Sequence, residues 1–264
     1  MLSATQKELH MTPPSGIHSL ERGLRLVTTL TELGETFTIS EIAAHMEIAR
    51  SAARRFVLTL EYMGYLELVE GRYRCRAKIT GLGEAFLQSS ELVQIAHPHL
   101  LKLRDEINET VSLTVLQDNM VTYLDRVAPE RLLAVNIVVG SRVPAYATAT
   151  GRVLLGQLPE EALDTYLASS RRAFTESTAT SAEFLKTAVM DAHARGWYMA
   201  EQQLRSGIIS LAAPVRNPKG GTVAAVNVSS SAARCTAQQI IDETLEPLLA
   251  CVEAISGSYL PQYS

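Results

Sequence analysis

The amino-acid sequence predicts an α+β protein that is divided into two domains. Its 264 residues are long for one domain and sufficient for two, and an apolar fraction of 47% provides material for hydrophobic cores. The first third of the chain has the pattern of three helices and a hairpin, whereas the remainder combines paired strands with helices, which is typical of an α+β arrangement. We expect an N-terminal arm at 1–17, a helical domain at 18–78, a linker helix at 79–92 and a larger α+β domain at 93–264.

Apolar spacing and capping signals predict the first two helices. Residues 18–34 place leucine or valine every three or four positions and end at a glycine, as an amphipathic helix does. Thr38 is followed three residues later by Glu41, which is the capping-box pattern at the start of a helix. A brief turn at 47–48 then leads to a third helix.

The third helix and the residues after it complete a recognisable order. The stretch ARSAARRFVLTLEYM is apolar-periodic and stops at Gly64, although Ala49 stands where a Ser, Thr or Asp cap is usual and cannot cap the helix. Two strand-like runs follow, YLELV and RYRCR, joined by a hairpin turn at Glu70 and Gly71. A winged helix-turn-helix domain has this order: three helices, the last two separated by a tight turn, and then a hairpin.

Basic residues are concentrated in this region of an otherwise acidic chain. Residues 50–78 hold seven basic and three acidic side chains, whereas the whole chain has a net charge of −4. At 100° per residue, the polar side of the third helix carries Arg50, Ser51, Arg54 and Arg55. In the hairpin, three arginines alternate with Tyr73 and Cys75 and are expected on one face: Arg72, Arg74 and Arg76.

These arginines in a winged-helix order predict binding to double-stranded DNA. The helix would place its arginines against guanine edges and phosphates, and the hairpin would contact the adjacent backbone or minor groove. Taken alone, each set of arginines is more often a solvated surface. A nucleoid-type structural binder is the other DNA-binding alternative, but it requires basic charge spread along the chain rather than confined to one segment.

Beyond residue 78 the chain changes character. Thr80 can begin a helix, and a second helix at 95–107 is expected to be broken by Pro98. Strands are expected at 111–117, 121–127, 132–139, 197–203, 209–216 and 222–230, and helices at 151–158, 159–168, 181–195 and 236–255.

The sequence contains little that indicates catalysis. It has no Cys-x-x-Cys, His-Glu-x-x-His or Gly-x-Ser-x-Gly motif, and its three cysteines are far apart. His97 and His99 flank a proline, so solvent-facing or packing roles are expected rather than a metal site. We therefore expect no enzymatic activity, cofactor or metal. An enzyme that acts on a small carboxylic acid, fused to a DNA-binding domain, is the alternative.

The stretch PAYATATGRVLLGQL contains the clearest signal for a ligand. Small residues from Ala147 to Gly151 lead directly into a helix, and such a start can present unpaired N–H groups to a carboxylate. A plain Thr-capped helix packed closely on a sheet explains the pattern equally well. Further along, Asn227 and Ser229 face one side of an otherwise apolar strand, where a ligand is one candidate partner.

From about Ser19 to Ile255 the chain resembles the IclR family of bacterial transcriptional regulators. The resemblance is carried by LERGLRLVTTLTELGETFTISEIA, ARSAARRFVLTLEYMGYL, PAYATATGRVLLGQL and ISLAAPVRNPKGGTVAAVNVS. The second and third stretches look most like the subgroup that governs protocatechuate, 4-hydroxybenzoate and β-ketoadipate catabolism. The resemblance implies a linker helix and a GAF-like effector domain after the winged helix-turn-helix.

The resemblance also implies where an effector binds. The family's pocket positions fall on Ala149, Thr150, Ser210, Asn227 and Ser229, and Tyr146 in the same turn fits an aromatic acid or longer dicarboxylate. The family's acidic pocket position falls on Ala200, which disfavours small keto acids. We accordingly expect a small carboxylic-acid effector, a homodimer or homotetramer on operator DNA, no contact with a membrane and a cytoplasmic location.

Overall fold

The computed structural model describes residues 17–30, 33–83, 89–129 and 137–259, which form two compact units at 1–85 and 86–264. The expected N-terminal arm lies outside the described residues, apart from its last residue. The strand expected at 132–139 also lies outside them, apart from its last three residues. The middle of the linker helix expected at 79–92 falls on residues 84–88, which are not described, so its extent and the domain boundary remain predictions.

The N-terminal unit has the winged helix-turn-helix order that the sequence predicts. Its elements are α1 (His18–Leu30), α2 (Ile39–His45), α3 (Arg50–Tyr62), β1 (Leu66–Val69), β2 (Arg72–Cys75) and a 3-10 turn at Ala77–Thr80. The helices and the antiparallel hairpin enclose a small core in which Leu26, Phe37 and Val57 are fully buried. The hairpin turn at Glu70 and Gly71 has positive φ angles of 51° and 81°, as the sequence suggested.

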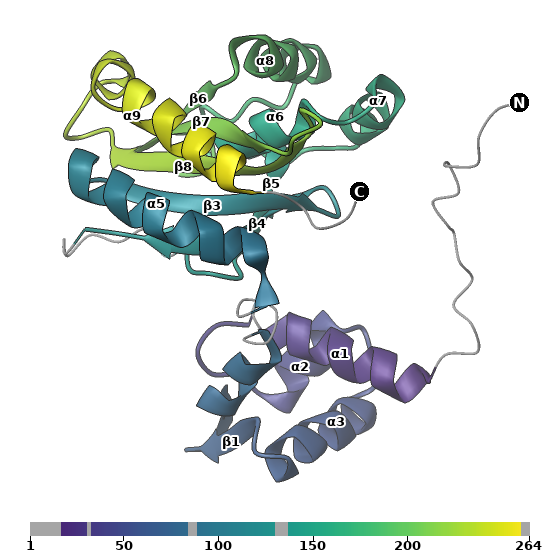
Figure 1. Ribbon diagram of the computed structural model, residues 1–264. Helices are drawn as coiled ribbons and strands as arrows, with labels where there is room; N and C mark the ends of the chain where they lie inside the picture. Colours follow the sequence, from purple (N-terminus) through teal and green to yellow (C-terminus); the bar gives the residue numbers. More distant parts are fainter. Residues whose placement is uncertain (1–16, 31–32, 84–88, 130–136, 260–264) are drawn as a thin grey trace, which may run out of the picture. The chain divides into compact units, whose positions relative to one another are not determined.

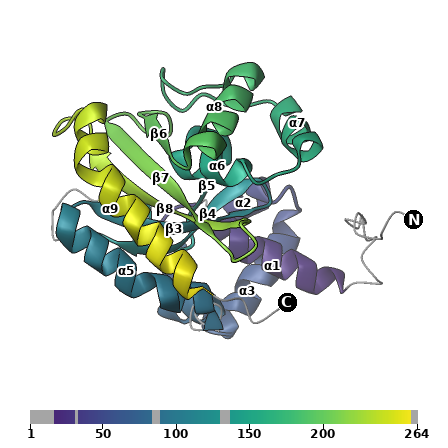
Figure 2. The same ribbon diagram turned by 45° about the horizontal axis from the view of Figure 1, so that its top comes forward.

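The C-terminal unit is built on one six-stranded antiparallel sheet. Figures 1 and 2 label its strands. Its strand order is β5-β4-β3-β8-β7-β6. The strands are β3 (Thr110–Gln117), β4 (Met120–Val127), β5 (Arg142–Pro144), β6 (Tyr198–Glu201), β7 (Ile208–Arg216) and β8 (Thr222–Ser231). The central pair β3 and β8 joins strands more than 100 residues apart, so the sheet brings the two ends of this unit together.

Helices cover both faces of the sheet. On one face α5 (Glu91–Ile107) and α9 (Ala237–Ser258) lie side by side over the core that includes Leu100, Leu211 and Leu248 (Figure 1). On the other face lies α6 (Ala149–Leu155), with α7 (Glu160–Ala168) and α8 (Ala182–Arg195) packed beyond it (Figure 2). The α+β class is confirmed, and the α6 face contains the cavity that the expected effector residues line.

Helix α5 corrects one expectation. It runs continuously through Pro98, where the sequence predicted a break. Pro98 is exposed, so the backbone hydrogen bond that it cannot make lies on the outer side of the helix. Water can bind there in place of the missing N–H donor. The inner side buries Ala96, Leu100 and Leu103 against the sheet, and this packing holds the helix together on both sides of the proline.

Candidate functional site

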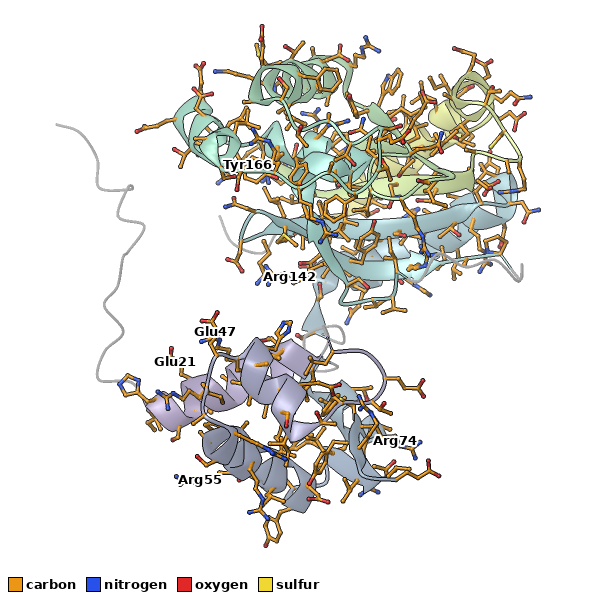
Figure 3. All side chains as sticks on the ribbon, turned by 180° about the vertical axis from the view of Figure 1, so that it is seen from behind. Glu21, Glu47, Arg55, Arg74, Arg142 and Tyr166 are labelled. Carbon is orange, nitrogen blue, oxygen red and sulfur yellow. The ribbon has the colours of Figure 1, made fainter. Side chains whose placement is uncertain are left out.

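The exposed side of α3 carries the four residues that the sequence analysis selected there. Ala53 and Val57 are buried in the core of the unit, whereas the opposite side is open to solvent. Its exposed residues include Arg50, Ser51, Arg54 and Arg55. Figure 3 shows Arg55 pointing away from the unit. Ala49 occupies the N-cap position and makes no side-chain hydrogen bond there, as the sequence predicted.

The arginines of the hairpin have partners within their own unit. Arg74 Nε lies 2.6 Å from Glu67 Oε1 on the facing strand, and Arg76 Nε lies 3.9 Å from Oε2 of the same carboxylate. Arg74 is labelled on the outer edge of the hairpin in Figure 3. Cys75 pairs with the buried Leu66 and so lies on the same face as Tyr73, as alternation predicts, although its own side chain at the end of the strand is exposed.

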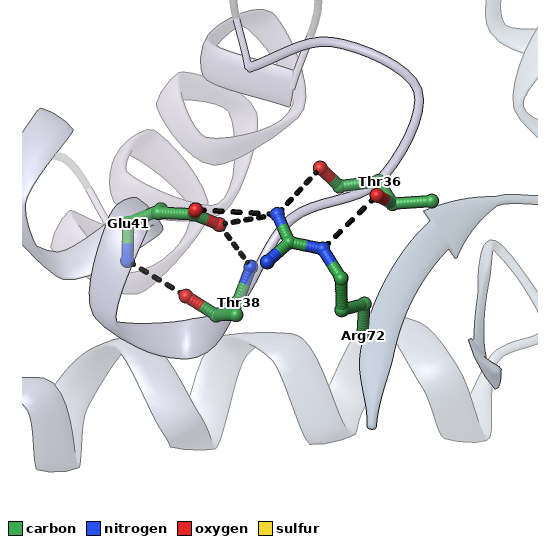
Figure 4. Close-up of polar contacts among 4 residues, drawn as sticks. All are labelled: Thr36, Thr38, Glu41 and Arg72. Carbon is green, nitrogen blue, oxygen red and sulfur yellow. Dashed lines mark hydrogen bonds and ion pairs between the residues drawn. The ribbon is translucent and has the colours of Figure 1, made fainter. Parts of the chain in front are cut away.

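Arg72 is tied to the start of α2, as Figure 4 shows. Its Nη2 lies 3.0 Å from Glu41 Oε2 and 3.1 Å from the Thr36 carbonyl oxygen, and its Nε donates to Thr36 Oγ1 at 3.0 Å. Glu41 is the third residue of the capping box with Thr38 that the sequence predicted. The backbone N–H of Thr38, and secondarily Arg72, hold the pKa of the Glu41 carboxyl below its usual value. Arg72 therefore braces the hairpin against the helix-turn-helix.

The arginines of α3 differ from those of the hairpin in their ion pairing. Among the residues that the structure describes, Arg50, Arg54 and Arg55 form no ion pair, whereas each hairpin arginine lies beside a glutamate. A guanidinium without an internal partner can give its hydrogen bonds to phosphate or to a base edge without breaking an existing ion pair. The α3 side is thus the stronger candidate for DNA contact.

The C-terminal unit has a cavity of about 360 Å³ between the sheet and the start of α6. Its wall includes four of the expected effector residues: Ala149, Thr150, Ser210 and Ser229. Most of the remaining wall is apolar, from Ile137, Val143, Ala147, Ala200, Leu204 and Ile208. A cavity of this size that combines apolar wall residues with polar side chains is typical of a site for a small organic ligand.

Asn227 lies behind the cavity wall rather than in it. Its side chain is 2% exposed, and its Nδ2 donates to Ser210 Oγ at 2.9 Å and to Ser229 Oγ at 2.8 Å. Ser210 and Ser229 are cross-strand partners on β7 and β8, so one amide reaches both hydroxyls. Because each serine oxygen already accepts from Asn227, its own O–H is left to donate toward the cavity.

Tyr146 also does not line the cavity. Its hydroxyl donates to the carbonyl oxygen of Arg172 at 2.7 Å, and its backbone N–H donates to Tyr166 Oη at 2.9 Å. The ring is 8% exposed and packs among the residues that support α6. Its polar end is already satisfied, so Tyr146 supports the wall from behind. Tyr166, which makes the second bond, is labelled on α7 in Figure 3.

The start of α6 combines a cap with a close approach. Thr148 Oγ1 accepts from the N–H of Gly151 at 2.9 Å. The helix is therefore Thr-capped, as in the alternative to a ligand-binding helix start that the sequence analysis gave. A Cβ atom at Gly151 would lie 1.9 Å from the carbonyl oxygen of Ala145. The backbone of the preceding 3-10 turn, Ala145–Ala147, therefore touches the helix, and both segments contribute to the cavity wall.

The sequence analysis missed four polar residues of the wall: Tyr123, Arg126, Gln203 and Arg205. Tyr123 and Arg126 are three apart on β4, so strict alternation places them on opposite faces. A bulge changes this, because Leu113 pairs with Asp125 whereas the next residue, Thr114, pairs with Tyr123. The extra residue on β4 turns Arg126 to the cavity face, a shift that sequence alternation does not reveal.

Burial affects the ionisation of two groups in the wall. It raises the pKa of Tyr123 to about 12, so this phenol stays protonated and able to donate. It also lowers the pKa of Arg126, although an arginine remains charged near neutral pH. The cavity is therefore lined by groups that donate hydrogen bonds or carry positive charge.

No group among the described residues has three or more His, Cys, Asp or Glu side chains placed to hold a metal ion. His97, one of the two histidines considered for a metal, has its Nδ1 2.7 Å from Asp125 Oδ2. No helix in the described ranges is long and apolar enough to cross a membrane.

Comparison with known families decides what the two units are. Residues 19–70 match the model of the IclR helix-turn-helix domain, and residues 84–257 match that of the bacterial transcriptional regulator IclR C-terminal domain. The chain belongs to the IclR family. Its GAF-like C-terminal unit is accordingly an effector domain, and the protein is an effector-responsive, DNA-binding transcriptional regulator and not an enzyme.

Individual IclR-family proteins match most of the chain. The Pca regulon regulatory protein of Pseudomonas putida is 34% identical over 239 residues, covering 90% of this chain and 82% of that protein. The p-hydroxybenzoate hydroxylase transcriptional activator of Acinetobacter baylyi is 31% identical over 241 residues, 88% of each chain. The crystal structure of a transcriptional regulator from Rhodococcus sp. RHA1 has a TM-score of 0.80 at 35% identity, covering 92% of this chain and 98% of that one.

Proposed function

We propose that this IclR-family regulator binds a small aromatic acid or a β-ketoadipate-like dicarboxylate in the cavity beside α6. The observation that carries this proposal is the Asn227 amide, which donates to both Ser210 and Ser229. Two hydroxyls held as acceptors by one amide can both donate to the same ligand atom or group. A carboxylate, which accepts several hydrogen bonds, suits that pair.

Charge in the wall supports the same class of ligand. Arg126 and Arg205 both line the cavity, whereas no aspartate or glutamate among the described residues does. The apolar residues of the wall would cover the ring or chain of an acid whose charged group faces the serines or the arginines. The first-turn N–H groups at Ala149 and Thr150 add donors at the other side.

The names of the relatives support a role in aromatic-acid catabolism. One relative regulates the pca regulon and the other activates expression of p-hydroxybenzoate hydroxylase. We propose that this protein likewise controls genes for the breakdown of an aromatic acid. We place it in the cytoplasm, since a bacterial regulator must reach its operator DNA there.

The proposed DNA contact is the exposed side of α3, with Arg50, Ser51, Arg54 and Arg55 against base edges and phosphates. Arg74 and Arg76 would contact the neighbouring backbone, and Arg72 would act mainly by holding the hairpin. One winged helix contacts only a few base pairs, too few to select one site in a genome. We therefore propose a homodimer or homotetramer that protects two half-sites, a state that sedimentation with and without operator DNA would detect.

Titration calorimetry with 4-hydroxybenzoate and with adipate tests the effector proposal. For whichever acid binds the wild-type protein, we expect Ser229→Ala to lower the affinity roughly 10- to 100-fold, because a hydrogen bond to a charged group is lost. Ser230→Ala is the matched control, since Ser230 neighbours Ser229 on β8 but is buried on the other face of the sheet, toward α9. Binding of neither acid would overturn the ligand class. Unchanged affinity in both Ser229→Ala and Asn227→Leu would place the ligand elsewhere.

A further inference from the structure

Arg152 is a buried arginine that has no counter-ion among the described residues. Its side chain on α6 is 0% exposed, and no carboxylate among the described residues lies within ion-pair distance of it. Its Nε and Nη1 atoms have no hydrogen-bond acceptor in the described part of the chain. Buried charges in proteins are normally paired, because a lone ion in a protein interior is costly.

Neutral groups hold this guanidinium in place. Nη2 donates to the carbonyl oxygen of Tyr146 at 3.1 Å and to Oε1 of Gln203. The Tyr198 ring lies 4.8 Å from the guanidinium carbon and the Phe184 ring 5.9 Å from it, as in cation–π contacts. Burial lowers the pKa of Arg152, yet an arginine keeps its proton at neutral pH. Within the described part of the chain, the positive charge is thus surrounded by dipoles and ring faces.

Gln203 connects this charge to the effector cavity. It is one of the cavity-lining residues, and its Oε1 accepts from the backbone N–H of Ala179 at 3.4 Å as well as from Arg152. Its main-chain carbonyl accepts from Thr178 Oγ1 at 2.6 Å, which fixes the residue at its other end. Since the amide oxygen is directed to Arg152, the Nε2 group is the end left to donate into the cavity.

We propose that Arg152 is a positioning residue that makes the effector cavity selective for anions. It orients Gln203 so that the amide donates to the ligand, and its own uncompensated charge lies directly behind that amide. The charge of a bound acid then supplies a counter-ion that none of the described residues provides. This inference rests on the proposed function and adds to it the reason for the charge preference.

Gln203→Glu tests the proposal because it supplies a counter-ion of nearly identical shape. The new carboxylate faces Arg152, so we expect the melting temperature of the unliganded full-length protein to rise by about 2–4 °C. The same carboxylate repels an acid in the cavity, so affinity for 4-hydroxybenzoate should fall by about tenfold or more. Gln202→Glu adds the same charge one residue away, where the side chain accepts from Gly207 N–H, and should change neither quantity.

A neutral ligand of the same shape separates charge selectivity from a structural role. Wild type should bind 4-hydroxybenzoate about tenfold or more tightly than 4-hydroxybenzamide, and Gln203→Glu should bring the two affinities close together. A lower melting temperature in Gln203→Glu would overturn the claim that Arg152 lacks a counter-ion. A higher one with an unchanged acid-to-amide ratio would overturn its role in selectivity. If wild type is stabilised by neither 4-hydroxybenzoate nor adipate, the proposed effector class fails and the selectivity role with it, whereas the stability result still decides the state of Arg152.

Discussion

Gly151→Ala should strongly destabilise the effector domain, although the same change in most helices stabilises. A Cβ at this position would lie 1.9 Å from the Ala145 carbonyl oxygen and 2.4 Å from both its carbonyl carbon and its Cα. Ordinary carbon–oxygen contacts are more than ~3 Å. The backbone of the 3-10 turn or of α6 must therefore move by more than ~1 Å, and neither segment has a flexible end that could yield.

We expect a loss of roughly 3 kcal/mol in the free energy of unfolding, the upper end of the range for overpacking, because the overlapping atoms are backbone. Without the overlap, alanine would gain up to ~1 kcal/mol over glycine in a helix, so the sign of the change is decisive. Urea unfolding monitored by circular dichroism measures it. Gly257→Ala is the control, since no atom lies within 4 Å of the added Cβ, and it should be neutral or slightly stabilising. A Gly151→Ala protein as stable as wild type would refute the argument.

Three further outcomes follow from the described contacts. Arg54→Ala should weaken binding to an operator selected by the wild-type protein by about 1–3 kcal/mol, and a double Arg50, Arg54 alanine variant that matched wild type in mobility-shift titrations would exclude α3 as the recognition helix. Arg72→Ala should lower the melting temperature of the N-terminal unit more than Arg74→Ala does, because Arg72 joins the hairpin to both Thr36 and the α2 capping box, whereas equal effects would deny the bracing role. Tyr123 keeps its proton more firmly in the folded state, with a pKa of about 12 against about 10 when unfolded, so the stabilisation that it provides is complete below pH ~10 and is lost as the pH rises toward 12. Urea unfolding at pH 9 and pH 11.5 should therefore show a smaller loss of stability for Tyr123→Phe than for wild type, and an equal loss would mean that this phenol is not buried.

Local chemistry explains which parts of the fold could be predicted. The capping box of Thr38 and Glu41, and the helix from Ser181 to its left-handed Gly196, are specified by a few adjacent residues, and the structure contains both. Pro98 was misjudged because the packing of α5 against the sheet, which no local pattern encodes, outweighs one missing hydrogen bond. The pairing of β3 with β8 likewise depends on contacts between distant segments.

The same distinction applies to the candidate site. Periodicity placed Asn227 and Ser229 on one face of their strand, and resemblance to the family added Ser210. Neither could show that Asn227 lies behind the serines, because that depends on side-chain lengths within a packed wall. Arg126 was missed because a single extra residue on β4 reverses the alternation after Tyr123. Arg152 was missed because only the folded structure shows that none of the described acidic side chains pairs with it.

The amide nitrogen of Asn227 determines whether the cavity wall donates or accepts hydrogen bonds, so replacing that one atom by oxygen could reverse the preference. An aspartate at this position accepts hydrogen bonds where the amide donates them, so both serine hydroxyls would turn their protons inward and present lone pairs to the ligand. Such a cavity would favour ligands that donate, such as amines or neutral amides, with its backbone shape unchanged. Regulators that share this scaffold could thus acquire a response to a chemically opposite signal through a residue that the signal molecule never touches.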